Sequence, residues 1–355
     1  MKVSMFQYLV GKFADRFGRL FTMLGRMESG LLSNELASFT PGPPVYVTGL
    51  ARSGTTILLE MLHSLGSFAS YKYNDYPFMD VPYFWNKFLR SAQKSSIQPQ
   101  ERAHGDGIYI TPFSPEAMEE PLWRRFFPHV HSLQTTHGLD GFSTGRFKKY
   151  YENTLKKLCL VHKKKRVLIK NNYNVLRMDA IKSMLGDSLF LVVVRNPLSH
   201  VESLLRQNLL FQKLHKENPK QRVVMKNICH FEFGLDTHPI IVTEESRKDL
   251  LDSLKKEDWV RYYAMQWRDI YNYIRTLADE SNESSVHVVR HEDFCDNFVE
   301  TFLKIVSLLR INVEDEIIDV LSAKVRQSRQ PELPEVQREL IMEITSGVAK
   351  GYGYF

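Results

Sequence analysis

The sequence is poor in the features that would assign it to a specialised class of protein. Only three of its 355 residues are cysteines, and Cys159, Cys229 and Cys295 form no C-x-x-C pair. Because disulfide frameworks and zinc sites need more cysteines at closer spacing, we expect three reduced thiols in a cytoplasmic protein. The longest uninterrupted apolar run covers residues 189–194. A membrane-spanning helix needs ~20 apolar residues, so we expect no transmembrane segment.

The charge balance is equally moderate. Forty-seven Lys and Arg residues against 41 Asp and Glu residues leave a formal net charge of +6. This small excess suits an anionic small ligand and is too weak to indicate nucleic acid as a partner. Hydrophobic residues make up 43% of the chain and charged residues 25%, which excludes a largely disordered protein.

We expect residues 1–40 to form an N-terminal amphipathic helical region, followed by one α/β domain over residues 41–355. Apolar side chains recur there at helical spacing, at Phe6, Leu9, Val10, Phe13, Phe17, Leu20, Phe21 and Leu24. Between them lie four cations, Lys12, Arg16, Arg19 and Arg26. No continuous apolar stretch or small-residue cleavage site indicates a secretory signal. Such a helix packs on its own domain or on a partner subunit in a homo-oligomer, and a basic amphipathic helix can also lie on a membrane surface.

Strand-like and helical segments alternate along the rest of the chain. Short β-prone runs occupy residues 45–48, 167–169, 189–194 and 286–289. Helical periodicity follows the first run at residues 55–65 and the third run after Pro197. Continuous apolar strands separated by helices indicate a parallel sheet that is covered on both faces.

A glycine loop connects the first strand to its helix. Residues 49–56 have the sequence G-L-A-R-S-G-T-T, which matches the G-x-x-x-x-G-x-T frame of a phosphate-binding loop. In such a loop, backbone N–H groups and the helix N-terminus converge on an anion. The residues that we assign to this contact are Arg52, Ser53, Gly54, Thr55 and Thr56. We therefore predict a P-loop NTPase-like α/β fold, a parallel sheet flanked by helices on both faces with a helical insertion after Ser203.

A cation stands where a metal-dependent nucleotide enzyme usually has an acidic residue. Such enzymes hold Mg²⁺ with a carboxylate at the end of a neighbouring strand, but Arg195 follows the strand at residues 189–194. Ser203 lies eight residues further, inside the next helix. An arginine fork and a hydroxyl at this separation can hold one phosphate group, so we expect a second anion site and no metal. Thr55 likewise replaces the Lys of nucleotide triphosphatases.

These two motifs resemble those of the sulfotransferases that use 3′-phosphoadenosine 5′-phosphosulfate (PAPS). Residues 52–56 are similar to the loop that holds the 5′-phosphosulfate, and Arg195 with Ser203 is similar to the 3′-phosphate site. With Arg in the loop, the pattern resembles the bacterial and tyrosylprotein-type branch more than the cytosolic aryl branch, which has Lys. The resemblance covers residues 45–203. It implies transfer of a sulfuryl group from PAPS to a hydroxyl or amine of a small-molecule or glycan acceptor.

Sulfuryl transfer needs in-line positioning and positive charge near the leaving phosphate. We expect Arg52 to supply one charge. The other comes from Lys170, which ends the strand at residues 167–169 and matches a Lys of the tyrosylprotein-type enzymes in order along the chain. The alternative for Lys170 is a solvated lysine at a strand end.

A general base must also take the proton of the acceptor. The resemblance implies either a carboxylate after the loop or a histidine. Asp75, twenty-three residues after Arg52, fits the first pattern, and His104 fits the second. Asp75 is also a common turn-former before a proline. Glu120 is a further candidate, although the pattern at residues 114–116 is typical of a helix cap and predicts that Glu116, Glu119 and Glu120 lie on a solvated first turn.

Two other functions stay open on the sequence alone. One is a metal-dependent P-loop nucleotide kinase. The other is a non-catalytic nucleotide-binding protein that uses its N-terminal helix to dock on a partner or a membrane. Tight, Mg²⁺-dependent binding of ATP would distinguish the kinase from a PAPS-dependent enzyme.

Overall fold

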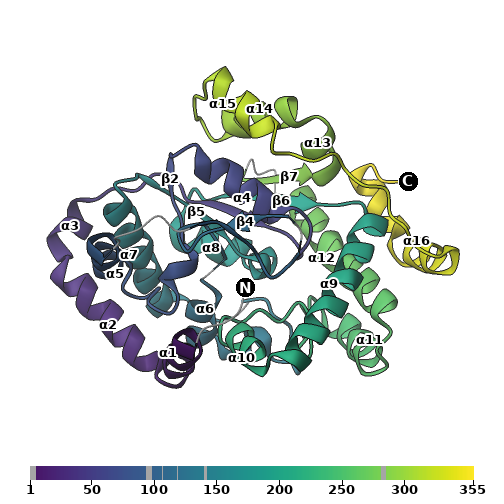
Figure 1. Cartoon of the computed structure of the whole chain (residues 1–355), viewed down its shortest axis with the longest axis horizontal. Coiled ribbons are helices and arrows are strands. Elements are labelled where there is room, and N and C mark those ends of the chain that lie inside the picture. Colours follow the sequence, from purple (N-terminus) through teal and green to yellow (C-terminus); the bar gives the residue numbers. More distant parts are fainter. Residues whose placement is uncertain (1–4, 93–97, 106, 118, 140–141, 281–284) are drawn as a thin grey trace.

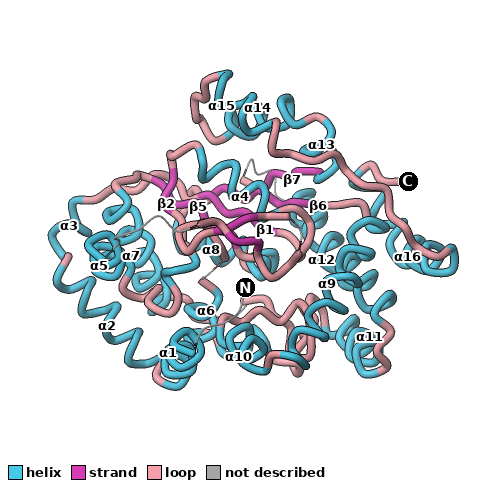
Figure 2. Tube along the Cα trace, in the orientation of Figure 1, coloured by secondary structure: helices cyan, strands magenta, loops and turns pink. Residues whose placement is uncertain are grey.

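The computed structural model describes residues 5–92, 98–105, 107–117, 119–139, 142–280 and 285–355. Within these residues, five strands form the central sheet, namely β1 (Val45–Thr48), β2 (Phe68–Ala69), β5 (Arg166–Lys170), β6 (Leu189–Val194) and β7 (Val286–Arg290). Their order is β2-β5-β1-β6-β7 (Figure 2), and every neighbouring pair is parallel. A separate antiparallel pair consists of β3 (Gln100–Glu101) and β4 (Tyr109–Ile110).

The four strands expected from the sequence are all confirmed. β1 and β6 have the predicted bounds, β5 extends one residue further at each end, and β7 extends one residue further at its carboxyl end. The sequence did not predict β2, β3 or β4. Each of these has two residues, which is too short to produce a recognisable pattern.

Alternate side chains of the strands enter two separate cores. Val45, Val47, Leu191 and Val193 point to one face, whereas Tyr46, Phe190 and Val192 point to the other. The first face is covered by α4 (Thr55–Ser64), α13 (His291–Asp296), α14 (Phe298–Leu308) and α15 (Asp315–Ser322). The second is covered by α6 (Glu120–Phe126), α7 (Gly145–His162), α8 (Met178–Leu185), α12 (Trp259–Glu280) and α16 (Glu335–Ala349). The predicted P-loop NTPase-like α/β fold with helices on both faces is confirmed.

A helical insertion separates β6 from β7, as predicted. It consists of α9 (Pro197–Glu217), α10 (Pro219–Asn227), α11 (Glu244–Lys255) and α12. Side chains of α9, α11 and α12 form a third core together with Ile341 of α16. In Figure 1, α9, α11 and α12 lie below and to the right of the sheet, whereas α10 lies at the bottom of the view beside α1. The insertion thereby holds α9 against the glycine loop.

The N-terminal helices run along the outer edge of the molecule (Figure 1). They are α1 (Met5–Arg16), α2 (Gly18–Leu31) and α3 (Ser33–Ser38), and α1 packs on α10 while α2 and α3 pack on α7. Nearby, α5 (Pro82–Ala92) also packs on α7. The short 3-10 helices are Tyr73–Asp75, Pro128–His131, Asn172–Leu176 and Lys350–Tyr352.

Two further expectations concern the whole chain. None of the helices in the described part of the chain combines the length and the apolar character that a bilayer crossing requires. Cys159, Cys229 and Cys295 are all free thiols, which confirms the prediction of three unpaired cysteines.

Candidate active site

The glycine loop follows β1 and ends in the first turn of α4, where its glycines allow a close approach of backbone. Gly49 has φ +140°, and a Cβ there would lie 2.5 Å from the carbonyl oxygen of Val193. Gly54 has φ +112°, and a Cβ there would lie 2.5 Å from Nδ1 of His291. A side chain at either position would therefore disrupt the loop. The loop amides lie at the N-terminus of α4, which favours an anion.

The predicted second anion site lies directly against this loop. Nη1 of Arg195 donates a hydrogen bond to the carbonyl oxygen of Arg52 (3.2 Å), and Nε of Arg52 donates to Oγ of Ser203 (3.4 Å). Nε of Arg195 is buried and has no hydrogen-bond partner among the described residues. The structure thus brings the three predicted residues together and leaves a buried donor for a ligand oxygen to satisfy.

Contacts from α9 and α12 fix this arrangement. Asn196 caps α9, because its side-chain oxygen accepts a hydrogen bond from the backbone N–H of Leu198 (3.0 Å). Nε2 of His200 lies 2.9 Å from the carbonyl oxygen of Ala51 in the loop. Burial, reinforced by the nearby Arg195, lowers the pKa of His200 to about 3, so the neutral ring donates this hydrogen bond. Nε1 of Trp267 donates to the carbonyl oxygen of Arg195 (2.9 Å).

Lys170 reaches the other side of the loop from the end of β5. Its Nζ lies 2.7 Å from Oγ1 of Thr56 and 2.9 Å from Oε1 of Glu116. Nη1 of Arg102 also donates to Oγ1 of Thr56 (3.2 Å) and lies 3.9 Å from Oε2 of Glu116. Lys170 is buried, so the alternative of a solvated lysine at a strand end is wrong. Lys170 and Arg195, which come from distant parts of the sequence, therefore both contact the loop that contains Arg52.

Comparison with known proteins agrees with this geometry. The family model described as "Sulfotransferase family" matches residues 43–223, about half of the chain, which include the loop, Lys170, Arg195 and Ser203. The chain belongs to the sulfotransferase family. This membership decides among the functions that the sequence left open, because it makes the protein a sulfotransferase rather than a kinase or a non-catalytic protein.

Solved sulfotransferases share the fold at low sequence identity. Sulfotransferase STF9 from Mycobacterium avium is 10% identical, with a TM-score of 0.56 over 92% of this chain and 82% of that one. Sulfotransferase STF1 from Mycobacterium tuberculosis H37Rv is 13% identical, with a TM-score of 0.52 over 95% of this chain and 86% of that one. No curated protein matches the chain in sequence.

Glu116 shares Lys170 with Thr56 of the glycine loop, and sequence reasoning did not assign it to this cluster. The solvated first turn predicted for Glu116, Glu119 and Glu120 is wrong, because α6 begins only at Glu120 and all three side chains are largely enclosed. The hydroxyl of Tyr73 donates to Oε2 of Glu116 (2.6 Å). Burial alone would raise the pKa of Glu116, but Lys170 and Arg102 lower it far below its usual range.

The hydrogen bonds of the Asp75 side chain go to residues outside the Lys170–Glu116 cluster. Its two carboxylate oxygens accept hydrogen bonds from the backbone N–H of Lys72 (2.8 Å) and from Nδ2 of Asn86 on α5 (2.8 Å). Burial raises the pKa of Asp75 to about 6. The bond from Lys72 caps the 3-10 turn at residues 73–75, and the bond from Asn86 connects this turn to α5. Both give Asp75 a structural role, so its role as the base stays a prediction that competes with Glu116.

His104 belongs to an aromatic group beside the Lys170–Glu116 pair. Its ring centroid lies 5.1 Å from that of Phe211 and 5.7 Å from that of His230. Nδ1 of His230 forms an ion pair with Oε2 of Glu232 (2.8 Å). Burial lowers the pKa of His230, but the ion pair with Glu232 outweighs this and raises it. Glu116 also raises that pKa and Lys170 lowers it.

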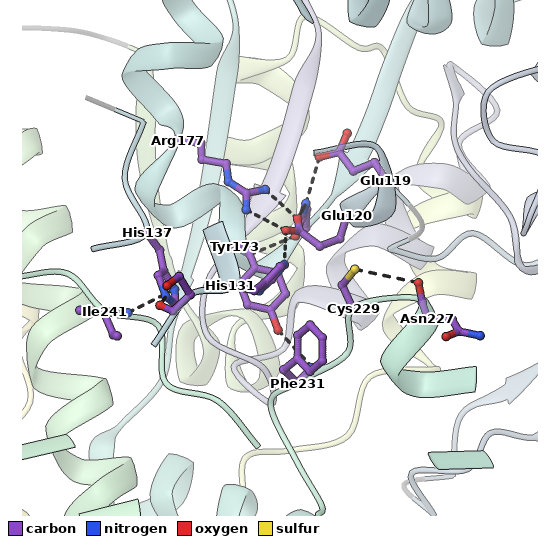
Figure 3. A network of polar contacts seen from close by, with 12 residues as sticks. Glu119, Glu120, His131, His137, Tyr173, Arg177, Asn227, Cys229, Phe231 and Ile241 are labelled. Carbon is purple, nitrogen blue, oxygen red and sulfur yellow. Dashed lines mark hydrogen bonds and ion pairs between the residues drawn. The ribbon is translucent and has the colours of Figure 1, made fainter. Parts of the chain in front are cut away.

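A second buried carboxylate network lies just beyond the end of β5 (Figure 3). Both guanidinium Nη atoms of Arg177 donate to Glu120, at 2.7 and 2.8 Å, and Nε2 of His131 lies 2.7 Å from the same carboxylate. Nδ2 of Asn171 donates to Glu120 (2.7 Å) and to Glu119 (3.2 Å). Because Asn171 directly follows Lys170, the network fixes the backbone from which Lys170 extends. Glu120, the third candidate for the base, is therefore engaged in structural contacts.

The described residues contain no group of three or more His, Cys, Asp or Glu side chains that could hold a metal ion. The prediction of a metal-free site stays a prediction. The polar groups that the sulfotransferase presents at the glycine loop are cations and hydroxyls, which match the chemistry of a phosphosulfate.

Proposed function

We propose that this sulfotransferase moves the sulfuryl group of PAPS to a hydroxyl or amine of its acceptor, with the glycine loop holding the 5′-phosphosulfate. The observation that carries the proposal is that Lys170 and Arg195 both bind this loop, which itself contains Arg52. The donor carries two anionic groups, and the site offers two sets of cationic and hydroxyl donors, Lys170 with Thr56 and Arg195 with Ser203, which Arg52 joins through its bond to Ser203. In each set the hydroxyls, Thr56 and Ser203, are buried.

In the proposed reaction, the bond between sulfur and the leaving 5′-phosphate oxygen breaks as the acceptor oxygen or nitrogen bonds to sulfur. The electron pair of the broken bond stays on the phosphate, whose growing negative charge Arg52, Lys170 and the loop amides stabilise. Arg195 and Ser203 hold the 3′-phosphate and thereby align the donor.

Glu116 is the proposed base that accepts the proton of the acceptor. With Lys170 and Arg102 beside it, its pKa is too low for efficient proton abstraction. The anionic donor competes for the same two cations, and their movement toward the donor raises the pKa of Glu116. Its hydrogen bond from Tyr73 keeps the carboxylate in place. Asp75 and His104 are the alternatives, and their variants are part of the tests below.

The test of donor recognition is calorimetry with 3′-phosphoadenosine 5′-phosphate, the desulfonated product, in the presence of a metal chelator. We expect tight binding that needs no Mg²⁺ and exceeds the affinity for ATP with Mg²⁺. Arg195→Ala should weaken binding by about 10- to 100-fold, because a charge-assisted hydrogen bond is worth ~1.5–3 kcal/mol. Ser203→Ala should have a smaller effect.

Two controls make this test specific. Affinity for adenosine 5′-monophosphate, which lacks the 3′-phosphate, should change little in either variant. Arg206→Ala removes another arginine of α9, which is 57% exposed and paired with Glu202, and should leave both affinities unchanged. Equal losses for both nucleotides would mean that Arg195 and Ser203 support the fold instead of the 3′-phosphate.

The acceptor and the setting complete the proposal. We propose a small-molecule or glycan acceptor, catalysis without a metal and action in the cytoplasm. Three free thiols support a reducing compartment. A screen of acceptors with sulfur-labelled PAPS identifies the acceptor class, and unchanged turnover after chelation supports the metal-free reaction.

A further inference from the structure

We propose that α1 and α2 form a docking surface for an anionic lipid membrane. Large apolar side chains are exposed along both helices, at Met5, Leu9, Phe13, Phe17, Leu20, Met23, Met27 and Leu31. We call these residues the apolar stripe. Their spacing of three or four residues places them on one side of the helices. An exposed apolar surface of this length is unusual for a side of a protein that contacts only water.

The opposite side of the two helices is anchored to the protein. Ala14, Phe21 and Leu32 are buried. Glu28 is buried and forms an ion pair with Nζ of Lys157 on α7 (2.9 Å). A side chain at Gly25 would collide with the hydroxyl of Tyr150 and the backbone of Asp80. The helices therefore lie flat on the domain, along the edge of the molecule seen in Figure 1, and the apolar stripe is exposed to solvent.

The apolar surface continues onto α5. The backbone N–H of Phe84 donates to Oε1 of Glu28 (2.8 Å), which places Phe84 beside α2. Phe84 and Phe88 are 44% and 58% exposed. The stripe is thus part of a broader surface built from two separate segments of the chain.

The charges on α1 and α2 indicate what binds to the apolar stripe. Lys12, Arg16, Arg19 and Arg26 are all exposed. The two acidic residues of these helices are engaged with the protein, Asp15 with Arg124 and Glu28 with Lys157. The outward side therefore combines apolar side chains with uncompensated positive charge. An anionic bilayer surface offers an apolar layer below a layer of negative headgroups, which matches both features.

A second copy of this chain fits the surface less well. In a symmetric dimer the same patch meets itself, so the four cations of one copy would face those of the other. A membrane imposes no such repulsion, and two short helices lying flat are the usual geometry of interfacial binding.

The test is flotation of the full chain with vesicles of phosphatidylcholine alone or with added phosphatidylserine. We expect binding mainly to vesicles that contain phosphatidylserine, and weaker binding at high salt. Leu9→Ser/Met27→Ser/Leu31→Ser changes three stripe residues that are 57%, 56% and 72% exposed. It should lower binding by about 10²-fold, because each side chain loses part of its apolar burial. Val299→Ser/Val320→Ser/Val336→Ser, which changes exposed apolar residues of α14–α16, should leave binding unchanged.

A charge variant separates the two components. Lys12→Gln/Arg19→Gln/Arg26→Gln should weaken binding to phosphatidylserine vesicles by roughly fivefold per charge and leave the residual binding to phosphatidylcholine unchanged. Equal binding to both vesicle types, or full binding by the stripe variant, overturns the proposal. So does a dimer in analytical ultracentrifugation that the stripe variant dissociates while no vesicle binds. Calorimetry with 3′-phosphoadenosine 5′-phosphate should give the same affinity for every variant, so the membrane proposal and the proposed function are tested independently of each other.

Discussion

Glu116 and Glu120 are separated by four positions in sequence and lie in two buried polar regions with different organisation. Glu120 is held by Arg177 through two hydrogen bonds, by His131 and by Asn171. Glu116 shares Lys170 and Arg102 with Thr56 of the glycine loop. Cations lower the pKa of both carboxyls against the effect of burial. Depressed pKa values therefore do not distinguish a catalytic carboxylate from a structural one.

The hydrogen-bond partners of Glu116 and Glu120 distinguish the two carboxylates. Arg177 is buried and its fork is used up by Glu120, so the arrangement has one stable geometry. Lys170 lies between a carboxylate and the hydroxyl of a phosphate-binding loop, so an anion at the loop competes for it. We infer that the Glu120 network sets the position of β5 and that the Glu116 cluster responds to the donor.

The largest expected effect separates the two regions by activity. Glu116→Gln keeps the shape of the side chain and removes the proton acceptor, so turnover with PAPS and an acceptor should fall by ~10²–10⁴-fold. Affinity for 3′-phosphoadenosine 5′-phosphate should not fall, because removing a negative charge beside Lys170 favours an anion. Steady-state kinetics and calorimetry on the same preparation measure both quantities.

Asp75→Asn and His104→Asn are the companion variants. If Glu116→Gln stays active while either companion loses turnover and still binds nucleotide, the base is reassigned to that residue. If Asp75 only caps its turn, Asp75→Asn should lower the melting temperature and retain turnover.

Glu120→Gln should act on stability instead. Breaking a buried ion pair leaves Arg177 without its counter-charge, which costs ~3–5 kcal/mol. The free energy of unfolding from urea titration should fall by this amount, while turnover per folded molecule should change far less than in Glu116→Gln. A stable but inactive Glu120→Gln protein would contradict the division between the two regions.

The pH dependence of stability follows from the same ion pair. Burial would raise the pKa of Glu120, but Arg177 lowers it to about 2, from an ordinary value of 4.5. A carboxyl with a lowered pKa stabilises the fold fully above its unfolded-state pKa and loses this contribution as the pH falls toward the folded-state value. The unfolding free energy of the parent protein should therefore decline between about pH 4.5 and pH 2, and Glu120→Gln should show a smaller decline.

Asn171→Ala tests the connection between the regions. The side chain of Asn171 donates to Glu119 and Glu120, and its backbone N–H donates to the carbonyl oxygen of Val47 in β1 (3.2 Å). Loss of the side-chain bonds should lower stability by ~1–3 kcal/mol. Displacement of the neighbouring Lys170 should reduce kcat by less than the ~10²-fold that a misplacement of 1 Å can cost, with little change in KM for the donor. Unchanged kcat would show that β5 holds Lys170 without this network.

The sequence predicts contacts between residues that are near in sequence better than contacts between distant segments. The glycine loop is contiguous, and Ser203 lies only eight residues after Arg195, so residue types and spacing predicted that these residues lie together, as the structure shows. The setting of Glu116 depends on two distant segments. Its backbone N–H donates to the carbonyl oxygen of Tyr71 (3.0 Å), and the N–H of Tyr73 donates to that of Ser114 (3.2 Å). No periodic pattern in the sequence predicts the pairing of residues 71–73 with residues 114–116, and an acidic residue after Ser-Pro resembles a helix cap.

The fold was more predictable than the site for the same reason. Long apolar strands such as β6 have a strong local pattern, whereas the two-residue strand β2 exists only through its pairing with β5. The long-range contact of His230 with His104 likewise depends on how the insertion between β6 and β7 folds back over the loop.

The smallest expected effect compares two tyrosines that make the same kind of bond in the two regions. Tyr73 donates to Glu116 (2.6 Å), and Tyr151 donates to Glu119 (2.5 Å). A hydrogen bond to an ionised carboxylate lowers its pKa, so Tyr73→Phe raises the pKa of Glu116. Because the base must be ionised, the acid limb of the kcat profile at saturating PAPS, which reports the pKa in the donor complex, should move to higher pH. The shift should be about one to two pH units, since a hydrogen bond to a charged group is worth ~1.5–3 kcal/mol and one pKa unit corresponds to about 1.4 kcal/mol. Activity on the plateau should stay nearly constant.

Tyr151→Phe is the matched control, because it removes a buried hydroxyl from a carboxylate that takes no proton in the reaction. It should lower stability without moving the acid limb. A shift of the profile in Tyr151→Phe but not in Tyr73→Phe would place the titrating base in the second network and reverse the roles of the two regions.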